Sequence, residues 1–335
     1  MSNTPLLEIK NLNMHFATNK GLLGRRRDTV KAVNDITFTV FEGETFGLVG
    51  ESGCGKTTVG RCALRIYEPT GGQVVYRGAD ITRMTSRQLK PYRRELQMIF
   101  QDPYSSLDPR QCVGSILREA AASGDKQWTA QSLEDRVHEL LDLVELNVSM
   151  KDRYPHEMSG GQRQRLGIAR ALACEPRLIV CDEPVSALDV SIQAQIINLF
   201  KKLQKQLGLT YIFIAHDLAV VRHISDRIAV MYLGRIVEIT DAAELYLTPL
   251  HPYTQALLSA VPVTDYDEEK CRTRITLQGE VPSPIHTPSG CPFHPRCPYA
   301  MDVCRREMPQ LKSYMPGHEA ACHKLQAGQE PGAYH

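Results

Sequence analysis

The sequence predicts an α/β fold that is interrupted by a helical segment and followed by a small C-terminal domain. Short apolar strand-like runs alternate with amphipathic helical segments, which is typical of a parallel sheet covered by helices on both faces. From about residue 112 to residue 146 the apolar spacing changes to that of a helix. After about Leu245 proline becomes frequent, and four cysteines fall between Cys291 and Cys322. We therefore expect one α/β domain with a helical insert, and a separate Cys-containing domain after it.

Runs of β-branched, aromatic and other apolar residues predict the strands. They cover residues 36–41, 44–49, 73–76, 96–100, 178–181, 211–214 and 228–232. An amphipathic helix is expected over residues 192–203, between two buried strands. The helical insert is indicated by apolar residues at i, i+3 and i+4 spacing with acidic residues between them. These apolar residues are Val137, Leu140, Leu141, Val144 and Leu146.

Length and charge narrow the class of protein further. The 335 residues suggest roughly two folding units. The chain carries 39 Lys and Arg against 38 Asp and Glu, and a net charge of +1 gives no electrostatic reason to expect a nucleic-acid partner. No apolar run approaches the ~18 residues of a membrane-spanning helix, and the first residues lack the pattern of a secretory signal. We expect an intracellular protein without a membrane span of its own.

Residues 50–57 read GESGCGKT and match the pattern GxxxxGK[ST]. The stretch follows a predicted strand and begins a predicted helix, which favours a phosphate-binding loop over a chance glycine-rich turn. Its glycines let backbone N–H groups surround a triphosphate, and the helix N-terminus favours negative charge. Lys56 is expected to reach the β- and γ-phosphates, and Thr57 to offer its hydroxyl to Mg²⁺. The predicted nucleotide-binding residues are Gly50, Glu51, Ser52, Gly53, Cys54, Gly55, Lys56, Thr57 and Thr58. A thiol near a helix N-terminus is acidified, so Cys54 is also a candidate redox switch.

Two adjacent acids, Asp182 and Glu183, follow the apolar strand predicted over residues 178–181. Neighbouring side chains of a strand point to opposite faces, so Asp182 can face a metal ion while Glu183 enters the turn. Asp182 is then expected to hold Mg²⁺ through water, and Glu183 to polarise the attacking water as a general base. A solvated acidic pair is the alternative. The phosphate-binding loop in the same chain favours the catalytic interpretation.

A third motif lies between these two, at the start of an amphipathic helix. Residues 158–165 read MSGGQRQR, and Ser-Gly-Gly at a helix start forms a second anion-binding N-terminus. One nucleotide does not need two such sites, so this one is expected to cap the γ-phosphate held by another subunit. Here the sequence resembles the ATP-binding cassette (ABC) ATPases, whose signature is serine-glycine-glycine-glutamine. The matching residues are Ser159, Gly160, Gly161 and Gln162.

The remaining motifs of that family occur in order over about residues 6–240. Gln101 matches the Q-loop, which in the family links the metal site to a transmembrane partner. Asp189 ends a stretch that matches the D-loop, and His216 matches the switch histidine that contacts the γ-phosphate. Phe16 stands where the family places an aromatic ring against adenine.

The resemblance implies a P-loop NTPase fold, with a RecA-like core, an antiparallel β subdomain and a helical subdomain at about residues 104–170. The ATPase domain is placed at residues 6–245 and the C-terminal domain at residues 246–335. ATP and Mg²⁺ are the implied cofactors. The resemblance also implies a head-to-tail dimer, in which each of two ATP molecules lies between the phosphate-binding loop of one subunit and the signature of the other. The implied catalytic residues are Lys56, Gln101, Glu183 and His216, and the implied Mg²⁺ residues are Thr57, Gln101 and Asp182.

Stretches outside these motifs resemble the ATPases of oligopeptide, dipeptide and nickel importers. They are residues 31–35, 51–56, 153–156, 249–258 and 279–284. The extended segment at residues 19–29 resembles the "F"-type subunit, the second of the two non-identical ATPases in these systems. The implied function is ATP-driven import of oligopeptides or dipeptides. Import of nickel or another small solute of the same family, or a soluble cassette ATPase without transport, are the alternatives.

The same resemblance implies the partners. They are a second homologous ATPase subunit, two transmembrane permeases and, through the permeases, an extracytoplasmic solute-binding protein. The implied location is the cytoplasmic face of the cell inner membrane, as a peripheral protein.

Four cysteines of the C-terminal region are separated by five, six and 17 residues: Cys291, Cys297, Cys304 and Cys322. Four thiolates suit a [4Fe–4S] cluster or a tetrahedral zinc ion. Structural zinc sites place at least one pair two to four residues apart, which these cysteines do not. His294 and His323 lie among them and keep a mixed zinc site open, and free thiols are common in the cytosol. Similar cysteine spacing in peptide-importer ATPases accompanies an iron–sulphur cluster, which is therefore the expectation here.

Overall fold

The computed structural model describes residues 4–18, 28–123, 128–261 and 275–326. The chain forms two compact units. The helical unit consists of Met1–Pro5, Phe41–Thr45 and Arg83–Ile214. The phosphate-loop unit, which carries residues 50–57, consists of Leu6–Val40, Phe46–Thr82 and Ala215–His335. Residues 19–27 of the segment that resembles the "F"-type subunit lie outside the described residues.

Parallel strands form the sheet of the helical unit. They are β6 (Leu96–Ile99), β7 (Leu178–Asp182) and β8 (Thr210–Ala215). Every residue of β7 and β8 is buried, which is why these strands read as uninterrupted apolar runs. The register pairs Ile99 with Cys181 and Asp182 with Ile214, so the carboxyl ends of the three strands meet at one edge. The predicted parallel sheet is confirmed.

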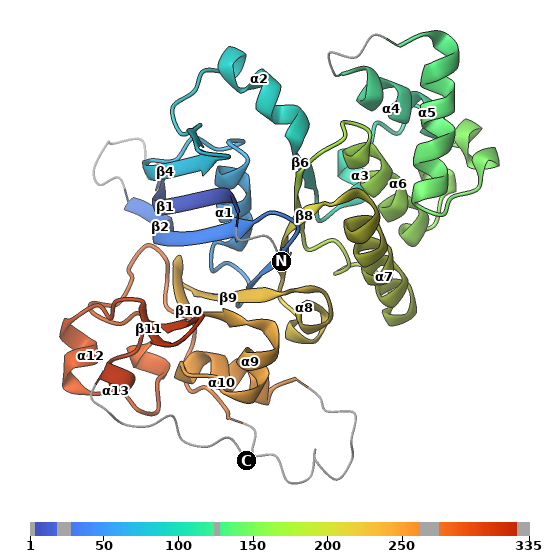
Figure 1. The fold of residues 1–335 in the computed structure, drawn as a ribbon. Helices are drawn as coiled ribbons and strands as arrows, with labels where there is room; N and C mark the ends of the chain where they lie inside the picture. Colours follow the sequence, from blue (N-terminus) through green and yellow to red (C-terminus); the bar gives the residue numbers. More distant parts are fainter. Residues whose placement is uncertain (1–3, 19–27, 124–127, 262–274, 327–335) are drawn as a thin grey trace. The chain divides into compact units, whose positions relative to one another are not determined.

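The helices of this unit lie beside that sheet, and some of them extend well beyond it (Figure 1). They are α2 (Ser86–Glu95), α3 (Pro103–Ser106), α4 (Val113–Ala122), α5 (Ala130–Leu143), α6 (Gly160–Leu172) and α7 (Val190–Leu207), with short 3-10 turns η1 (Val148–Asp152) and η2 (Pro155–Glu157). The helical pattern read over residues 112–146 is confirmed, but as two helices. Thr129 begins the second one with a capping box, and Val137, Leu140 and Leu141 on its apolar face are buried.

The phosphate-loop unit contains two groups of strands. The first has the order β2-β1-β4-β5 and comprises β1 (Pro5–Thr18), β2 (Asp28–Phe41), β4 (Gly71–Tyr76) and β5 (Ala79–Asp80). Strand β4 pairs with both β1 and β5 in antiparallel fashion, which agrees with the implied antiparallel β subdomain.

The second group has the order β11-β12-β10-β9-β3. Its strands are β3 (Thr45–Val49), β9 (Arg227–Tyr232), β10 (Arg235–Asp241), β11 (Lys312–Met315) and β12 (His318–Ala320). β3 and β9 are parallel, and the other pairs are antiparallel. The accompanying helices are α1 (Lys56–Ala63), α8 (Leu218–Ile224), α9 (Ala242–Leu247), α10 (Pro252–Ser259), η3 (His294–Arg296), α12 (Asp302–Arg306) and α13 (His323–Gln326).

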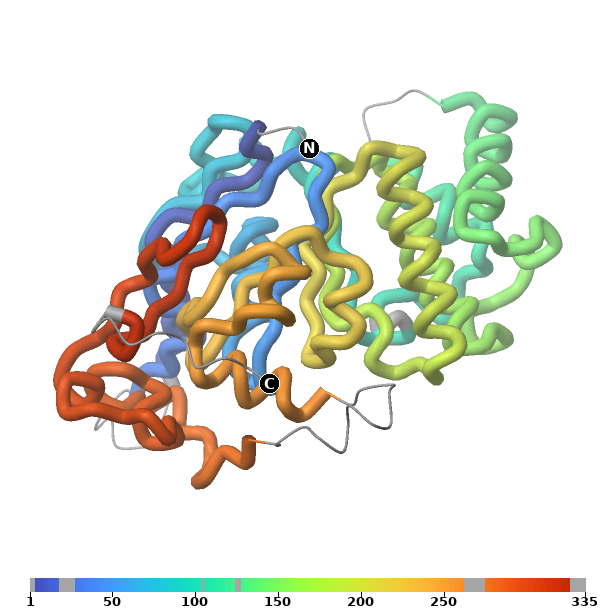
Figure 2. The backbone as a smooth tube through the Cα atoms, turned by 60° about the horizontal axis from the view of Figure 1, so that its bottom comes forward, coloured from blue at the N-terminus to red at the C-terminus, as the bar shows by residue number. Residues whose placement is uncertain are grey.

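The cysteine-containing segment joins the sheet of the phosphate-loop unit. Glu238 of β10 pairs with Ala320 of β12, and the backbone N–H of Lys31 in β2 donates to the carbonyl of Pro284 (3.4 Å). Figure 2 shows the orange and red C-terminal segments next to the blue strands. The separate domain predicted to begin at residue 246 stays a prediction.

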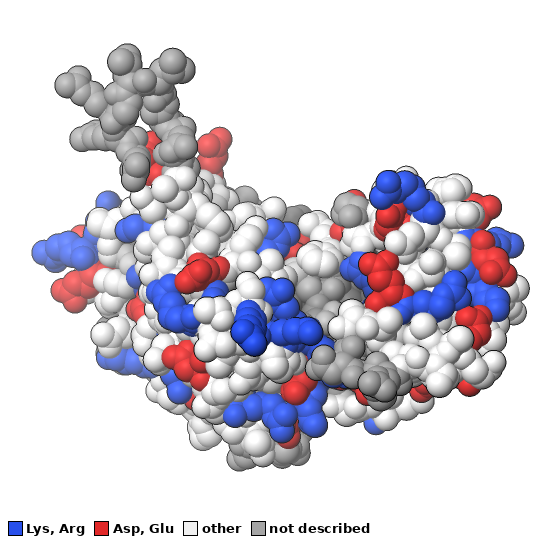
Figure 3. All heavy atoms as spheres, turned by 90° about the horizontal axis from the view of Figure 1, so that it is seen from above, with Lys and Arg blue, Asp and Glu red and all other residues white. Residues whose placement is uncertain are grey.

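One face of the molecule carries charged side chains of both signs. On the face drawn in Figure 3, acidic groups stand among the basic ones. This arrangement agrees with the near-zero net charge of the sequence. Among the described residues, none of the helices has the length and apolar character needed to cross a membrane.

Candidate functional site

The phosphate-binding loop connects β3 to α1 in the phosphate-loop unit. Gly50 has φ +151° and Gly55, the N-cap of α1, has φ +107°. A Cβ on Gly55 would lie 2.1 Å from the carbonyl oxygen of Ala32, and one on Gly50 would lie 2.2 Å from that of Met231. Both positions therefore exclude any side chain, which fixes the tight path of the loop. Thr57 and Thr58 lie in the first turn of α1, and Ser52 and Gly53 are exposed.

Lys56 folds back onto the loop that precedes it. Its side chain is buried, and Nζ donates to the carbonyl oxygens of Gly50 (2.7 Å) and Glu51 (3.1 Å). The ammonium group is thus held by the same loop whose N–H groups would surround a phosphate.

The structure contradicts the acidified thiol that a redox switch at Cys54 would need. Cys54 is 4% exposed, and burial raises the pKa of its thiol, an effect that outweighs the attraction of Lys56. A thiol with a raised pKa is mostly protonated and poorly nucleophilic, so the helix N-terminus does not activate it.

Two contacts to the loop come from residues that sequence reasoning did not single out. The backbone N–H of Glu51 donates to Oη of Tyr253 (2.9 Å), and Arg296 donates to both carboxylate oxygens of Glu51 (2.7 and 3.0 Å). Tyr253 is the second residue of α10, and Arg296 is the last residue of η3. These residues lie 202 and 245 positions from Glu51, so no local pattern could have indicated the contacts.

The same unit carries two further predicted residues. Phe16 lies in β1, with its ring edge-on to Tyr67 at a centroid distance of 5.7 Å. His216 directly follows β8 and is exposed, and Asp217 next to it caps α8 by accepting from the N–H of Ala219 (2.8 Å). Their roles toward adenine and the γ-phosphate stay predictions.

The carboxylate pair lies at the end of β7 in the helical unit. Asp182 is 2% exposed. Glu183 has φ +45°, its N–H donates to the carbonyl of Ile214 (3.0 Å), and its Oε2 accepts from Nε2 of Gln101 (3.0 Å). The structure therefore brings the predicted Q-loop residue and the predicted general base into direct contact. A positive φ at a non-glycine residue stores strain, which is concentrated at functional sites.

The signature begins α6 through a reciprocal capping box. The side chain of Ser159 accepts from the N–H of Gln162 (3.3 Å), and the side chain of Gln162 accepts from the N–H of Ser159 (2.9 Å). A Cβ on Gly161 would lie 2.7 Å from Cγ2 of Ile192, so this glycine lets α6 pack closely against α7.

The D-loop residue Asp189 caps α7. Its Oδ1 accepts from the hydroxyl of Ser191 (2.7 Å) and from the N–H of Ile192 (3.0 Å), and these hydrogen bonds lower the pKa of the carboxyl. A cavity of this unit is lined by Gln101 and Tyr104 beside Gly160, Arg163 and Leu188. Residues of the Q-loop, the signature and the D-loop thus line the same cavity.

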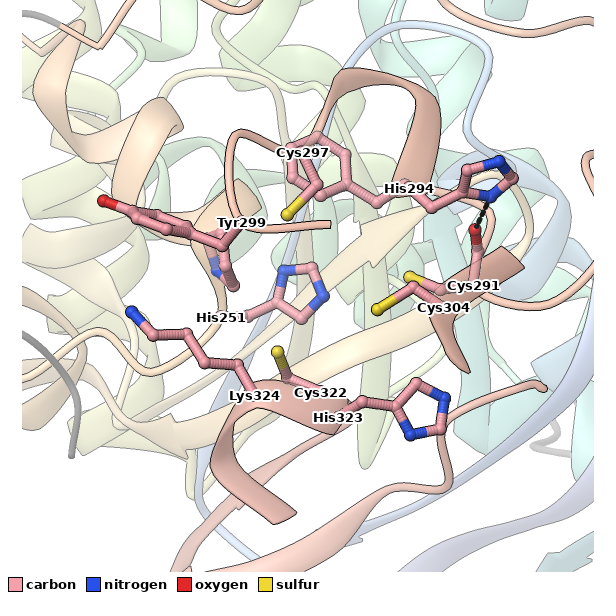
Figure 4. A pocket seen from close by; sticks show the side chains of 11 residues that line it. His251, Cys291, His294, Cys297, Tyr299, Cys304, Cys322, His323 and Lys324 are labelled. Atoms are coloured by element: carbon pink, nitrogen blue, oxygen red, sulfur yellow. Dashed lines mark hydrogen bonds between the residues drawn. The ribbon is translucent and has the colours of Figure 1, made fainter. Parts of the chain in front are cut away.

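The four cysteines of the C-terminal region line one small cavity in the phosphate-loop unit. Figure 4 shows their sulphur atoms turned toward a common space, although they come from different short segments. The thiols of Cys291, Cys304 and Cys322 are buried, and Cys297 is half-buried. Burial, with a smaller contribution from the neighbouring thiols, raises the pKa of Cys291 to about 12 and that of Cys297 to about 11.

The two histidines among these cysteines point to backbone carbonyls instead. Nδ1 of His294 is 2.9 Å from the carbonyl of Cys291, and Nε2 of His323 is 3.0 Å from that of Glu307. Figure 4 shows both rings at the edge of the cavity, away from its centre. Within the described residues, no group of three or more His, Cys, Asp or Glu side chains has the geometry to hold a metal ion.

A different histidine, His251, lies against the same cavity. It is 1% exposed, and its Nδ1 accepts from the N–H of Tyr253 (3.0 Å), which places the proton of the neutral ring on Nε2. Burial lowers the pKa of His251 to about 4, so the ring is neutral at physiological pH.

The loop, helix start and buried carboxylate strand define a nucleoside-triphosphatase of the phosphate-loop class. The ABC transporter family matches residues 33–186, and the C-terminal region of oligopeptide/dipeptide transporters matches residues 237–304. The chain belongs to the ABC transporter family as an ATP-binding protein and is an ABC-type ATPase, with ATP as its substrate and Mg²⁺ as the metal that this class requires.

Curated relatives align over almost the whole chain. The putative oligopeptide transport ATP-binding protein YkfD of Bacillus subtilis is 54% identical over 323 residues, with 96% of each chain covered. The oligopeptide transport ATP-binding protein AppF of the same organism is 52% identical, over 95% of this chain and 97% of the relative. A putative peptide import ATP-binding protein of Brucella ovis is 51% identical, over 96% and 98%.

Solved ABC structures share the fold of the cassette. The ATP-binding cassette MJ0796, a dimer in a post-hydrolysis state bound to ADP and Pi, is 26% identical with a TM-score of 0.63, over 71% of this chain and 99% of that chain. The cbiO1 protein of Clostridium perfringens, part of the transporter complex cbiONQ, is 25% identical with a TM-score of 0.63, over 73% and 91%. These likenesses confirm the predicted cassette fold.

Proposed function

We propose that this chain is the ATP-hydrolysing subunit that powers ABC-type import of oligopeptides or dipeptides across the cytoplasmic membrane. The observation that carries this proposal is the match of residues 237–304 to the oligopeptide/dipeptide transporter C-terminal region, on a chain that also carries the ATP-binding cassette. Relatives named for oligopeptide transport and peptide import cover nearly its full length. Nickel and other small solutes are the alternative cargo.

The proposed roles follow the chemistry of each side chain. Lys56 neutralises charge on the β- and γ-phosphates, and Glu183 accepts a proton from the attacking water. Thr57 offers its hydroxyl to Mg²⁺, Asp182 holds the ion through water, and Gln101 is the third Mg²⁺ residue. The metal would neutralise charge on the phosphates. His216 contacts the γ-phosphate. Gln101 orients Glu183 through the hydrogen bond between their side chains.

The proposed assembly is a heterodimer with a second homologous ATPase subunit. ATP is held between the phosphate loop of one subunit and Ser159–Gln162 of the other. The dimeric state of the similar cassette MJ0796 supports this arrangement. Two permeases connect the dimer to an extracytoplasmic solute-binding protein, and the chain lies peripherally on the cytoplasmic face of the membrane.

We test this function by co-expressing the chain with two permeases and a second ATPase. Co-purification of all four proteins, with ATP hydrolysis stimulated by peptide and its binding protein, is the expected result. Stimulation by nickel alone would change the cargo. A chain that hydrolyses ATP while it stays a soluble homodimer in the presence of the permeases would favour the non-transport alternative.

We further propose that the four cysteines hold a [4Fe–4S] cluster. They line one small cavity, and burial raises the pKa of Cys291 and of Cys297, so unbound thiolates at these two positions would be unfavourable. Among the described residues, no group of three or more His, Cys, Asp or Glu side chains has the geometry to hold a single metal ion, which argues against a bare Zn²⁺ here. A [4Fe–4S] cluster is held by four Cys thiolates, the number of cysteines that line this cavity. It would act as a structural staple for a segment with little core.

Metal analysis of anaerobically purified protein tests the cluster. A brown protein with iron and labile sulphide is expected, colourless after Cys297→Ser and unchanged after Cys174→Ser, which removes a half-buried thiol of the helical unit. Stoichiometric zinc without sulphide would replace the cluster by zinc. Protein without any bound metal would contradict both.

A further inference from the structure

Arg296 forms a two-bond ion pair with the phosphate-binding loop. Its Nη1 and Nη2 donate to Oε2 and Oε1 of Glu51 at 2.7 and 3.0 Å, the parallel geometry that makes Arg–carboxylate pairs strong. The Arg296 side chain is 8% exposed and that of Glu51 is 26% exposed, so water screens this pair only partly.

Aromatic rings fix the position of the guanidinium. Arg296 lies over the ring of Tyr232, 6.0 Å from its centroid, and Tyr232 packs against Tyr253 and Phe293 at centroid distances of 4.7 and 5.3 Å. The two residues that contact Glu51 from outside the loop, Tyr253 and Arg296, thus belong to one packed cluster.

Glu51 is the second residue of a loop that must accept an anion. Its N–H donates to Tyr253, its carbonyl accepts from Nζ of Lys56 at 3.1 Å, and its carboxylate is bound by Arg296. An unpaired carboxylate at this point would repel a triphosphate, and the repulsion would be strong because the surroundings are partly desolvated. Arg296 cancels this charge and holds it in a fixed position.

We infer that Arg296 is a positioning residue for ATP binding: it neutralises Glu51 and makes the phosphate-binding loop dependent on the cysteine-containing segment. The residue precedes Cys297 directly, and its N–H donates to the carbonyl of Phe293 (3.0 Å) within the turn that separates Cys291 from Cys297. Any interaction that holds the turn between Cys291 and Cys297 in place therefore also holds Arg296 against Glu51. This inference rests on the proposed role of the loop in binding ATP.

Four variants of the full-length chain test the inference by ATP affinity, measured by calorimetry, and by KM and kcat. Arg296→Ala should weaken ATP binding about tenfold, with kcat at saturating ATP changed less than about twofold. Glu51→Gln removes the charge itself, and its ATP affinity is the reference for the double variant. Arg296→Ala added to Glu51→Gln should change ATP affinity less than about twofold relative to Glu51→Gln alone. Arg306→Ala, which removes an exposed arginine of α12, is the matched control and should bind ATP like the parent.

The double variant separates charge neutralisation from a structural role. If Arg296 only held the fold together, Glu51→Gln would not rescue Arg296→Ala, and that result would overturn the inference. Equal ATP affinity of Arg296→Ala and the parent chain would overturn it too. Should Arg296→Ala not fold, Arg296→Gln replaces it, and its ATP affinity is measured at low and high salt. High salt should partly restore the affinity, because it screens the repulsion between the unpaired Glu51 carboxylate and the triphosphate. A parent chain that binds no ATP would instead contradict the proposed function.

Discussion

At Glu183 the backbone and the side chain are both constrained. Its φ of +45° lies in the left-handed region, where a residue other than glycine costs about 1–2 kcal/mol. Hydrogen bonds hold this conformation: its N–H donates to Ile214, its carbonyl accepts from the Ser186 hydroxyl (3.0 Å) and its carboxylate accepts from Gln101. Strain fixed in this way keeps the carboxylate in one direction, as a general base requires.

Replacing Glu183 with Gln should lower the ATP hydrolysis rate by at least about a hundredfold, because an amide cannot accept the proton of the attacking water. The shape of the side chain and the hydrogen bond from Gln101 are retained, so ATP affinity should stay within about twofold. Both quantities are measured on the purified chain. Glu175→Gln, at an exposed acid that also has a positive φ (+55°), is the matched control and should hydrolyse ATP normally. Hydrolysis by Glu183→Gln at the parent rate would refute the assigned role.

The sequence predicted the parts of the site whose residues lie close together along the chain, and it did not predict contacts between residues that are far apart along the chain. The loop of residues 50–57 and the pair Asp182 and Glu183 are contiguous, so their spacing alone indicates phosphate and metal chemistry. Arg296 and Tyr253 reach Glu51 only through the folded chain, and a single sequence contains no sign of such a contact. The burial that raises the pKa of Cys54 is likewise a tertiary property that outweighs the local helix N-terminus.

At the scale of elements, α6 and α2 begin with the same device. Ser159 and Gln162 form a capping box at α6, and Thr85 and Gln88 form one at α2. Each cap satisfies backbone N–H groups that have no partner within the helix. A capping box thus stabilises the start of both helices, but only α6 carries the signature. Substitutions at the two caps can therefore be compared directly.

Ser159→Ala and Thr85→Ala should each lower the free energy of unfolding by about 1 kcal/mol, since each removes one cap. Only Ser159→Ala should also lower ATP hydrolysis in the assembled dimer, because only that hydroxyl is proposed to face a nucleotide. Urea unfolding and steady-state hydrolysis measure the two effects. An equal loss of hydrolysis in both variants would reduce the signature serine to a helix cap.

The elements that the sequence predicted well are those whose burial is uniform. β7 and β8 are buried along their whole length and read as apolar runs. β1 was missed because charged and amide side chains interrupt its apolar residues, so that it does not read as an apolar run, although apolar and polar residues alternate along much of it, the pattern of a half-buried strand. Helix α2 was missed because it is strongly charged and contains Pro91, although its capping box at Thr85 was a usable signal.

At the scale of the whole molecule, the predicted nucleotide residues divide between two compact units. The phosphate-loop unit carries the loop, Phe16 and His216, and the helical unit carries Gln101, the signature, Asp182, Glu183 and Asp189. The contact from Arg296 to Glu51 lies within the first of these. In the proposed dimer, by contrast, the signature of this chain completes the nucleotide site of the partner subunit. A substitution in the signature can therefore prevent association of the two subunits while this chain still binds ATP at its own phosphate loop.

A chain that binds ATP but cannot hydrolyse it should accumulate in the associated state. We expect Glu183→Gln with ATP to assemble with the second ATPase subunit, as seen by light scattering, and to dissociate when ATP is removed. Adding Ser159→Arg should prevent assembly, because a long side chain at the start of α6 would fill the space for the partner's nucleotide. Its own phosphate loop is unchanged, so the double variant should still bind ATP. Assembly that persists with Ser159→Arg would contradict the proposed dimer, in which ATP lies between the phosphate loop of one subunit and the signature of the other. If Glu183→Gln instead assembles only with itself, the heterodimer would be replaced by a homodimer, and the role of the signature would stand.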